Sequence, residues 1–394
     1  MSQTVQARSA IPIVVATVFV DVVGFAMVLP LLPSYAARFG SSPFMIGVLV
    51  ASYSAMQFVF APLWGRVSDR IGRRPVLLLG LGGSVVSYLL FAMSNGFTLL
   101  LISRLFDGGS GATINVAQAY LADETSPERR TRAMGIVGAA FGLGFIVGPI
   151  LGGITSSIDL ALPGYAAAAL TAANMVFAWI KLPESHHALT PQRTSHAPLP
   201  WRVIGPPVAV LFAATIAFSV MYVVFPLFGE LRFGATRSTV SYWFAFVGLV
   251  TAIVQGGLLG RLVARLGETR VARIGTAMLA AGFFLVPLAG ATSRPTVLFY
   301  GVLALLGAGF GMTGPSMIGM VSRFTDAARQ GRVLGVTQSA SSMARIVGPI
   351  VAGLMMQSRG AEAAFRTSAV LAATGMIIAI AMRPAHDKGA DGAR

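Results

Sequence analysis

Cysteine is absent from this chain, histidine occurs four times, and charged residues make up only 11% of its 394 residues. The absence of cysteine excludes disulfides and thiolate metal sites. Soluble domains carry about 25% charged residues, whereas this chain is 55% hydrophobic with a mean hydropathy of +0.75. A water-soluble protein of this composition would expose too much apolar surface, so that class of protein is excluded.

Apolar stretches of about 20 residues recur along the whole chain, and each is long enough to cross a bilayer as a helix. The sequence therefore predicts an all-α, polytopic membrane protein with twelve transmembrane helices. The first stretch is too long for the apolar region of a signal peptide and is expected to remain as a helix. The predicted spans are 11–33, 43–65, 75–94, 97–122, 133–157, 163–182, 204–229, 238–262, 271–291, 295–322, 331–357 and 362–383.

The longest polar stretch, 181–202, divides these spans six and six. Its Pro, Ser, Thr and His content is typical of a flexible linker. We expect an N-terminal six-helix bundle over 1–182, a cytoplasmic linker over 183–203 and a C-terminal six-helix bundle over 204–394. All four histidines lie in the linker or the C-terminal tail, so none is expected inside the membrane.

The net charge of +15 has two readings. It could mark a nucleic-acid surface, but most of the 29 Lys and Arg residues fall on one side of the membrane if both termini are cytoplasmic. The positive-inside rule accounts for that asymmetry. We therefore predict a multi-pass protein of the inner, cytoplasmic membrane with both termini inside and with no nucleic-acid partner.

The two halves of the chain repeat each other. "GRVSDRIG" (65–72) matches "GRLVARLG" (260–267), and "GFIVGPILGG" (144–153) matches "ARIVGPIVAG" (344–353), at offsets of 195 and 200. Matches at nearly one offset indicate two six-helix units of parallel topology.

A cluster of charge in the first copy of this repeat carries a family resemblance. It matches the pattern G-x-x-x-D-R-x-G-R-R at Gly65, Asp69, Arg70, Gly72, Arg73 and Arg74. With the repeat, this pattern resembles the loop signature of the major facilitator superfamily (MFS). In that family the loop braces the cytoplasmic side in the outward-facing state, so the resemblance implies a conformational latch; the alternative is that the arginines only fix topology. Glycines at 65 and 72 are expected to permit a tight turn and close helix approach.

The second copy has lost the acid of this pattern. Ala264 stands at the position of Asp69, Glu268 at that of Arg73 and Thr269 at that of Arg74. The predicted latch is therefore asymmetric, with its charges mainly in the first half.

Three further motifs resemble those of the twelve-helix drug/proton antiporters, which include the tetracycline exporters. They are "DVVGFAMVLPLLP" (21–33), "SRLFDGGSGA" (103–112) and "GLGFIVGPILGG" (142–153). The last implies export rather than uptake. Its small residues at a spacing of four should let another helix pack closely, and its proline should add a kink; tight packing alone would also account for it. This antiporter motif comprises Gly144, Gly148, Pro149, Gly152 and Gly153.

Charged residues inside membrane spans are costly and usually have a use. Asp21 is predicted to bind a proton or substrate, with a fixed pair to an arginine as the alternative. Arg104 and Asp107 lie three residues apart, so they either pair structurally or take part in proton coupling; the resemblance assigns proton movement to Arg104. Arg345 either attracts an acidic substrate or neutralises Asp21 or Glu230, and Glu230 itself has an interfacial alternative.

A hydrophobic substrate needs a cavity with aromatic walls and a few polar groups. Its candidates, with Arg345, are Tyr53, Gln57, Asn115, Gln118, Tyr222, Phe225, Trp243, Gln255 and Gln338.

The leading hypothesis is a monomeric, proton-coupled exporter of amphipathic drug-like compounds that works by alternating access; the alternative is a transporter of lipids or organic anions on the same fold. The absence of acids within spans eight and nine weakens a specific tetracycline assignment. A membrane enzyme is not expected, because H-E-x-x-H is missing, and we expect no metal or other cofactor.

Overall fold

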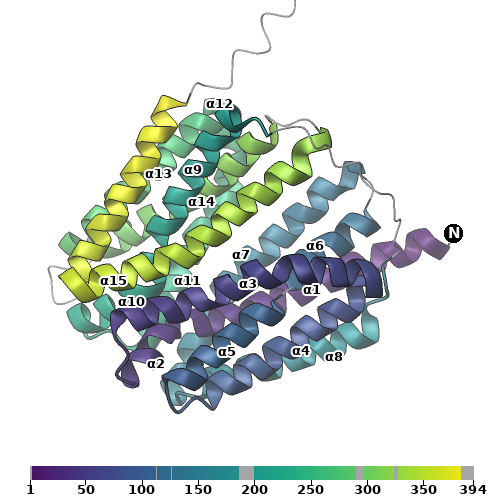
Figure 1. Cartoon of the computed structure of the whole chain (residues 1–394), viewed down its shortest axis with the longest axis horizontal. Helices are drawn as coiled ribbons and strands as arrows, with labels where there is room; N and C mark the ends of the chain where they lie inside the picture. The colour runs from purple at the N-terminus through teal and green to yellow at the C-terminus, as the bar shows by residue number, and fades with distance from the viewer. Residues whose placement is uncertain are drawn as a thin grey trace, which may run out of the picture. The chain divides into compact units, whose positions relative to one another are not determined.

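The computed structural model describes residues 2–111, 113–125, 127–185, 199–289, 297–323 and 327–382, and throughout these ranges the regular structure is helical. Figure 1 shows the helices in chain order. In the first half they are α1 (Ser2–Val28), η1 (Leu29–Leu31), α2 (Leu32–Arg38), α3 (Pro43–Ile71), α4 (Arg73–Ala92), α5 (Phe97–Ser110), α6 (Thr113–Glu124), α7 (Pro127–Ile158) and α8 (Leu162–Lys181).

The second half follows the same plan. Its helices are α9 (Trp201–Phe218), α10 (Val220–Phe233), α11 (Arg237–Ile253), η2 (Val254–Leu258), α12 (Leu259–Leu266), α13 (Glu268–Ala289), α14 (Val297–Arg323) and α15 (Ala327–Ala381). The 55 residues of α15 are two helices joined at Gly360, which has φ +85°.

Nine helices of the described ranges are long and apolar enough to cross a membrane by length and composition. One of these, Arg332–Ala381, has the length of two spans and contains the bend at Gly360. Outside this group, α5 and α6 together cover the predicted span 97–122 with a break at Gly111, and α8 has 20 residues. The helical order therefore agrees with the predicted all-α, twelve-span organisation.

The chain forms two compact units, which we describe separately. Unit 1 comprises Met1–Thr190 and Ala235–Gly248, and unit 2 comprises Pro191–Gly234 and Leu249–Arg394. Span eight thus begins in unit 1 and ends in unit 2, a division that the sequence does not show.

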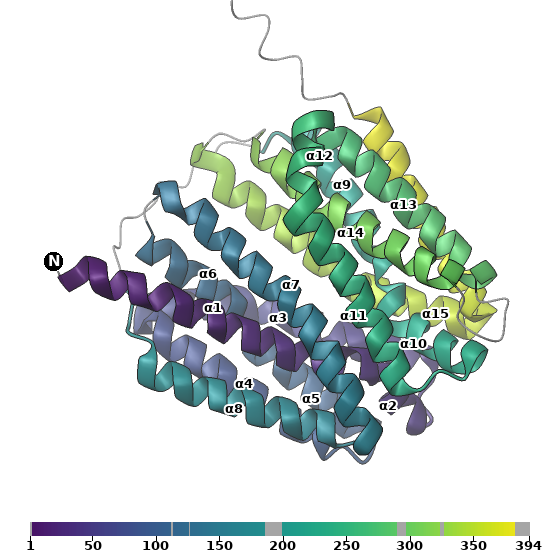
Figure 2. The ribbon, with the colours of Figure 1, turned by 180° about the vertical axis from the view of Figure 1, so that it is seen from behind.

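Corresponding helices pack together in the two units. In unit 1, α1 packs on α7 and α4 packs on both α8 and α5, as Figures 1 and 2 show. In unit 2, the helices at the matching positions do the same, because α9 packs on α15 and α13 packs on α15 and α14. The internal sequence repeat is therefore a repeat of helix packing.

Local sequence explains where the key helices begin and end. Ser42 accepts a hydrogen bond from the Met45 amide (3.3 Å) and Pro43 follows it, a usual start for a helix such as α3. Gly72 ends α3 with φ +104°, a backbone conformation that favours glycine. Because α4 starts at the next residue, this one glycine turns the chain between two long helices.

Candidate functional site

The first cluster of interacting charges lies in unit 1 where α3 ends, α4 begins and α6 and α8 end; we call this the loop end. Arg73 is at its centre and is only 13% exposed. Its guanidinium contacts Asp69 at 2.6 Å and Asp123 at 3.0 Å, and it donates to the Ser68 hydroxyl at 2.6 Å. Two acids and a hydroxyl from α3 and α6 are thus held by one arginine.

The other arginines of the predicted motif differ in their surroundings. Arg74 donates from its guanidinium to the Trp179 carbonyl, which ties the start of α4 to the end of α8. Arg70 is exposed at the end of α3. Of the charged residues in the predicted motif, Asp69, Arg73 and Arg74 therefore lie at the loop end, where Arg73 and Arg74 contact the ends of neighbouring helices.

One expectation for this motif needs correction. Gly65 was expected to share in the turn and to allow close helix approach, but it lies inside α3, six residues before the helix ends. Among the described residues, nothing lies within 4 Å of the position that a Cβ at residue 65 would take. The turn forms at Gly72 alone because the helix continues without a break through Gly65.

Two acids of the loop end were not identified from the sequence. Asp123 lies just beyond the predicted end of span four, and Glu184 lies in the segment assigned to the linker. Glu184 accepts hydrogen bonds from the Arg73 and Arg74 amides at 2.7 and 3.1 Å. The sequence contains one indication of such acids, the pair of arginines at the start of a helix. Positive side chains there are unfavourable unless a negative charge lies nearby.

Unit 2 has its own version of this arrangement. Gly267, with φ +79°, separates α12 from α13. Glu268 begins α13 and forms an ion pair with Arg323 at the end of α14 (3.2 Å). Arg273, five residues further along α13, donates to the carbonyls of Ala379 and Ile380 at the end of α15 and to that of Met382 just beyond it.

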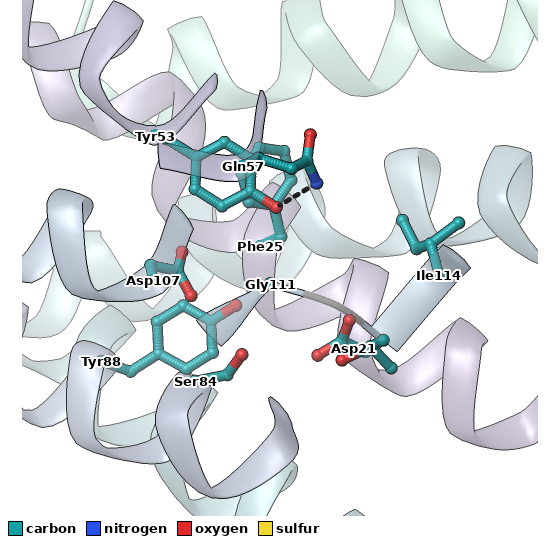
Figure 3. Close-up of a pocket in the computed structure, with 10 residues that line it drawn as sticks. Asp21, Phe25, Tyr53, Gln57, Ser84, Tyr88, Asp107, Gly111 and Ile114 are labelled. Atoms are coloured by element: carbon teal, nitrogen blue, oxygen red, sulfur yellow. Dashed lines mark hydrogen bonds between the residues drawn. The ribbon is translucent and has the colours of Figure 1, made fainter. Parts of the chain in front are cut away.

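The second cluster is a small pocket in the interior of unit 1. Figure 3 shows side chains from α1, α3, α4, α5 and α6 around it, together with Gly111 at the end of α5. The cavity is about 10 Å³, close to the least that one water molecule needs. Its lining residues are Asp21, Phe25, Tyr53, Gln57, Ser84, Tyr88, Asp107, Gly111, Thr113 and Ile114.

Arg104 and Asp107, one turn apart on α5, form a buried ion pair beside this pocket. Their side chains are 1% and 3% exposed and their nearest charged atoms are 3.1 Å apart. Arg104 also donates to the Ser87 hydroxyl at 3.2 Å and lies over the Phe91 ring, 5.7 Å from its centroid. The pair that the sequence spacing suggested is present.

Asp21 enters the pocket from α1. Its Oδ1 atom is buried, and no hydrogen-bond partner for it lies in the described part of the chain. Asp107 and Thr113 line the same pocket as Asp21. Between Asp21 and Asp107, only Asp107 has a guanidinium as a direct partner in this pocket.

Aromatic and amide side chains that line the pocket also contact one another. The rings of Phe25 and Tyr53 lie with centroids 4.8 Å apart. Gln57 donates to the Tyr53 hydroxyl at 3.4 Å, the dashed line in Figure 3. Two of the predicted cavity residues therefore border the acidic pocket.

The glycines of the antiporter motif allow α7 to lie close to α1. A Cβ at Gly144 would come within 2.7 Å of Val22, and one at Gly148 within 2.6 Å of Ala26. Gly152 faces Met27 in the same way, so three of the four glycines share one face. Gly153 instead faces Tyr242 and Ser241 of α11, within unit 1. The repeat of this motif behaves alike, because Gly348 of α15 approaches Ser219 and Ile216, at the end of α9.

Arg345 lies in unit 2 on α15 and is partly buried. It donates to the Ser342 hydroxyl at 3.0 Å, and its charge acts on the Tyr222 hydroxyl. An arginine, a serine and a tyrosine are groups that together suit an anionic ligand. The structure thus brings two predicted substrate residues, Arg345 and Tyr222, near each other.

The remaining cavity candidates differ in exposure. Phe225 and Trp243 are buried, with exposed fractions of 0% and 1%. The four polar candidates have exposed side chains although they lie on apolar helices: Asn115, Gln118, Gln255 and Gln338. In the described ranges, no three His, Asp or Glu side chains gather to hold a metal ion.

Comparison with known proteins agrees with this architecture. The family model described as Major Facilitator Superfamily matches residues 14–349, with a further match over 211–394. The chain is 33% identical to the class C tetracycline resistance protein of Escherichia coli, covering 88% of this chain and 89% of the relative. It is 28% identical to multidrug resistance protein 2 of Bacillus subtilis (strain 168), covering 87% and 88%.

A solved structure gives the same answer for the fold. The human organic anion transporter MFSD10 (TETRAN) superposes with a TM-score of 0.72 at 25% identity, over 95% of this chain and 99% of that one. Long apolar helices, repeated packing, the charged turn at Gly72 and matches along most of the chain lead to one assignment: the chain belongs to the Major Facilitator Superfamily and is a membrane transporter, not an enzyme.

Proposed function

We propose that the protein exports amphipathic, drug-like compounds in exchange for protons by alternating access. The observation that carries this proposal is the pocket of unit 1, where Asp21 lies near an Arg104–Asp107 pair. An acid without an ionic partner in an apolar interior can gain and lose a proton, whereas an acid held by a guanidinium stays charged. Asp21 is therefore the proton-binding group, and Arg104 and Asp107 shape its surroundings.

The relatives support the substrate class. Proteins named for tetracycline resistance and multidrug resistance match most of this chain. The pocket of unit 1 has room for about a water molecule, so it suits a proton site rather than a drug site. The exposed polar side chains on apolar helices, Asn115, Gln118, Gln255 and Gln338, supply the substrate cavity in this proposal, and both termini lie in the cytoplasm.

The loop end acts as a latch in this scheme. Arg73 joins α3, α4 and α6 through Asp69 and Asp123, and these ion pairs would form or break as the cytoplasmic side closes or opens. Such a two-state element is what alternating access requires.

The test is transport by the purified protein in liposomes with an imposed pH gradient. We expect the gradient to drive tetracycline or a hydrophobic drug against its concentration gradient, with protons moving the opposite way. Equal drug movement with and without the gradient would contradict proton coupling. No movement of any amphipathic compound, with organic anions moving instead, would contradict the substrate class.

That second outcome is the alternative function. Arg345 with Ser342 and Tyr222 offers an anion-binding group, and the structurally similar MFSD10 is an organic anion transporter. We therefore include organic anions in the substrate panel.

A further inference from the structure

The start of α4 carries the wrong sign of charge for a helix. Its first two residues are Arg73 and Arg74, it has no acid in its first turn, and Gly72 offers no side chain to cap it. The first amides of a helix lack internal partners, and the helix dipole places partial positive charge there. Two arginines at this point add to that charge, so α4 needs an acceptor from elsewhere.

Glu184 supplies that acceptor from 110 residues away. Its Oε1 accepts from the Arg73 amide at 2.7 Å and from the Arg74 amide at 3.1 Å. A Cβ at Gly72 would come within 2.6 Å of the other carboxylate oxygen, so Glu184 occupies the space that a side chain at residue 72 would need. The cap by Glu184 therefore requires a glycine at residue 72.

The chain around Glu184 is fixed in place. Leu182 is 2% exposed and belongs to the same apolar cluster as Val76 and Leu77 of α4. The Tyr120 hydroxyl donates to the Pro183 carbonyl at 2.9 Å. Residues 182–185 consequently belong to the loop end, although the sequence assigns 183–185 to the linker.

In the second half, the negative charge at the start of the corresponding helix comes from a different position. There α13 begins with an acid, Glu268, at the position of Arg73. The segment after the last predicted span of that half, "RPAH" (383–386), shares the proline of "LPES" (182–185) and has Ala385 where Glu184 stands. Among the described residues, nothing lies within 4 Å of a Cβ at Gly267. The acid stands at the helix start in one repeat and after the last helix in the other.

From this exchange we propose that Glu184 is a positioning residue of the latch: it caps α4 and thereby holds Arg73 where it meets Asp69 and Asp123. The contribution to transport rests on the proposed function of the loop end, whereas the cap itself does not. By its cap, Glu184 also connects residues 182–185, where the predicted linker begins, to the latch.

The first test measures the cap directly in the purified full-length protein. Glu184→Ala should speed hydrogen exchange in a peptide covering residues 68–80 by about fivefold, the change expected when a typical N-cap is lost. Glu184→Asp should recover part of the protection. Glu362→Ala removes another exposed carboxylate, paired with Arg366, and is the matched control; it should leave this peptide unchanged. Unchanged exchange in Glu184→Ala would overturn the proposal.

The second test separates the cap from the latch. If both proposals hold, Glu184→Ala should lower the maximal transport rate at unchanged half-saturating substrate, and Asp69→Asn should lower it without changing exchange at the start of α4. Normal transport by Asp69→Asn would reject the latch but leave the cap standing. Reduced transport by Asp69→Asn with normal transport by Glu184→Ala would reject the positioning role of Glu184.

Discussion

Asp21 and Asp107 line one pocket but have different partners. Asp107 is held by Arg104, while Asp21 has a buried oxygen without a hydrogen-bond partner in the described ranges. Asp21→Asn should abolish coupling, because the amide cannot exchange a proton for cargo. Drug-driven proton release, measured with a pH dye in liposomes, should disappear while substrate binding persists. If the release continues unchanged, the coupling role passes to Asp107.

Arg345 distinguishes the two classes of substrate. A guanidinium that binds an acidic group contributes about 1.5–3 kcal/mol, the range for hydrogen bonds to charged groups. Arg345→Ala should therefore weaken binding of anionic or zwitterionic compounds by that amount and leave cationic drugs unaffected or better bound. Titration of the purified variant with one compound of each charge measures the difference. Equal losses for all compounds would show that Arg345 has a structural role.

At the scale of single helices, the contact of α1 with α7 depends on the absence of side chains. A Cβ at Gly148 would come within 2.7 Å of the Val23 carbonyl oxygen, which is backbone and cannot rotate away. Gly148→Ala should therefore destabilise the protein by about 1–3 kcal/mol, as overpacking usually does. Thermal unfolding in detergent measures this. Gly138→Ala is the control, because it lies on the same helix with nothing within 4 Å in the described ranges, and it should not destabilise the protein. If Gly148→Ala is as stable as Gly138→Ala, the close contact of α7 with α1 does not limit stability.

The sequence predicted the helices well because long apolar runs leave little choice of structure in a membrane. It predicted less of the loop end, since Glu184 and Asp123 meet Arg73 only through folding over 111 and 50 residues. The Arg104–Asp107 pair could be predicted because both residues lie on one helix, one turn apart. The pocket could be predicted only in part, because its residues come from five helices and from Gly111 at the end of α5.

Across the whole molecule, the two repeats use opposite polarity for one contact. Arg73 meets Asp123 in unit 1, and Glu268 meets Arg323 in unit 2. Glu268→Arg and Arg323→Glu should each reduce thermal stability, and the double variant should recover most of it. Because Arg323 is 70% exposed, the coupling should be about 1 kcal/mol or less. A double-mutant cycle measures it, and a double variant no better than the sum of the singles would contradict the pairing.

The corresponding exchange in unit 1 should fail. Arg73→Glu with Asp123→Arg would leave the new glutamate beside Asp69, which now contacts Arg73 at 2.6 Å. Like charges at this spacing repel. In unit 2 the matching position is Ala264, so no such acid interferes.

The contacts that hold residues 182–185 also matter for protein engineering. Anyone who divides the gene to express the two halves as separate chains, or who inserts a fluorescent reporter between them, has to choose a junction. A junction between Lys181 and Glu184 would pull Leu182 from its apolar cluster and the carboxylate from the α4 amides. The N-terminal fragment should therefore keep its native start of α4 only if it runs through Ser185, three residues past the point where hydropathy alone would place the cut.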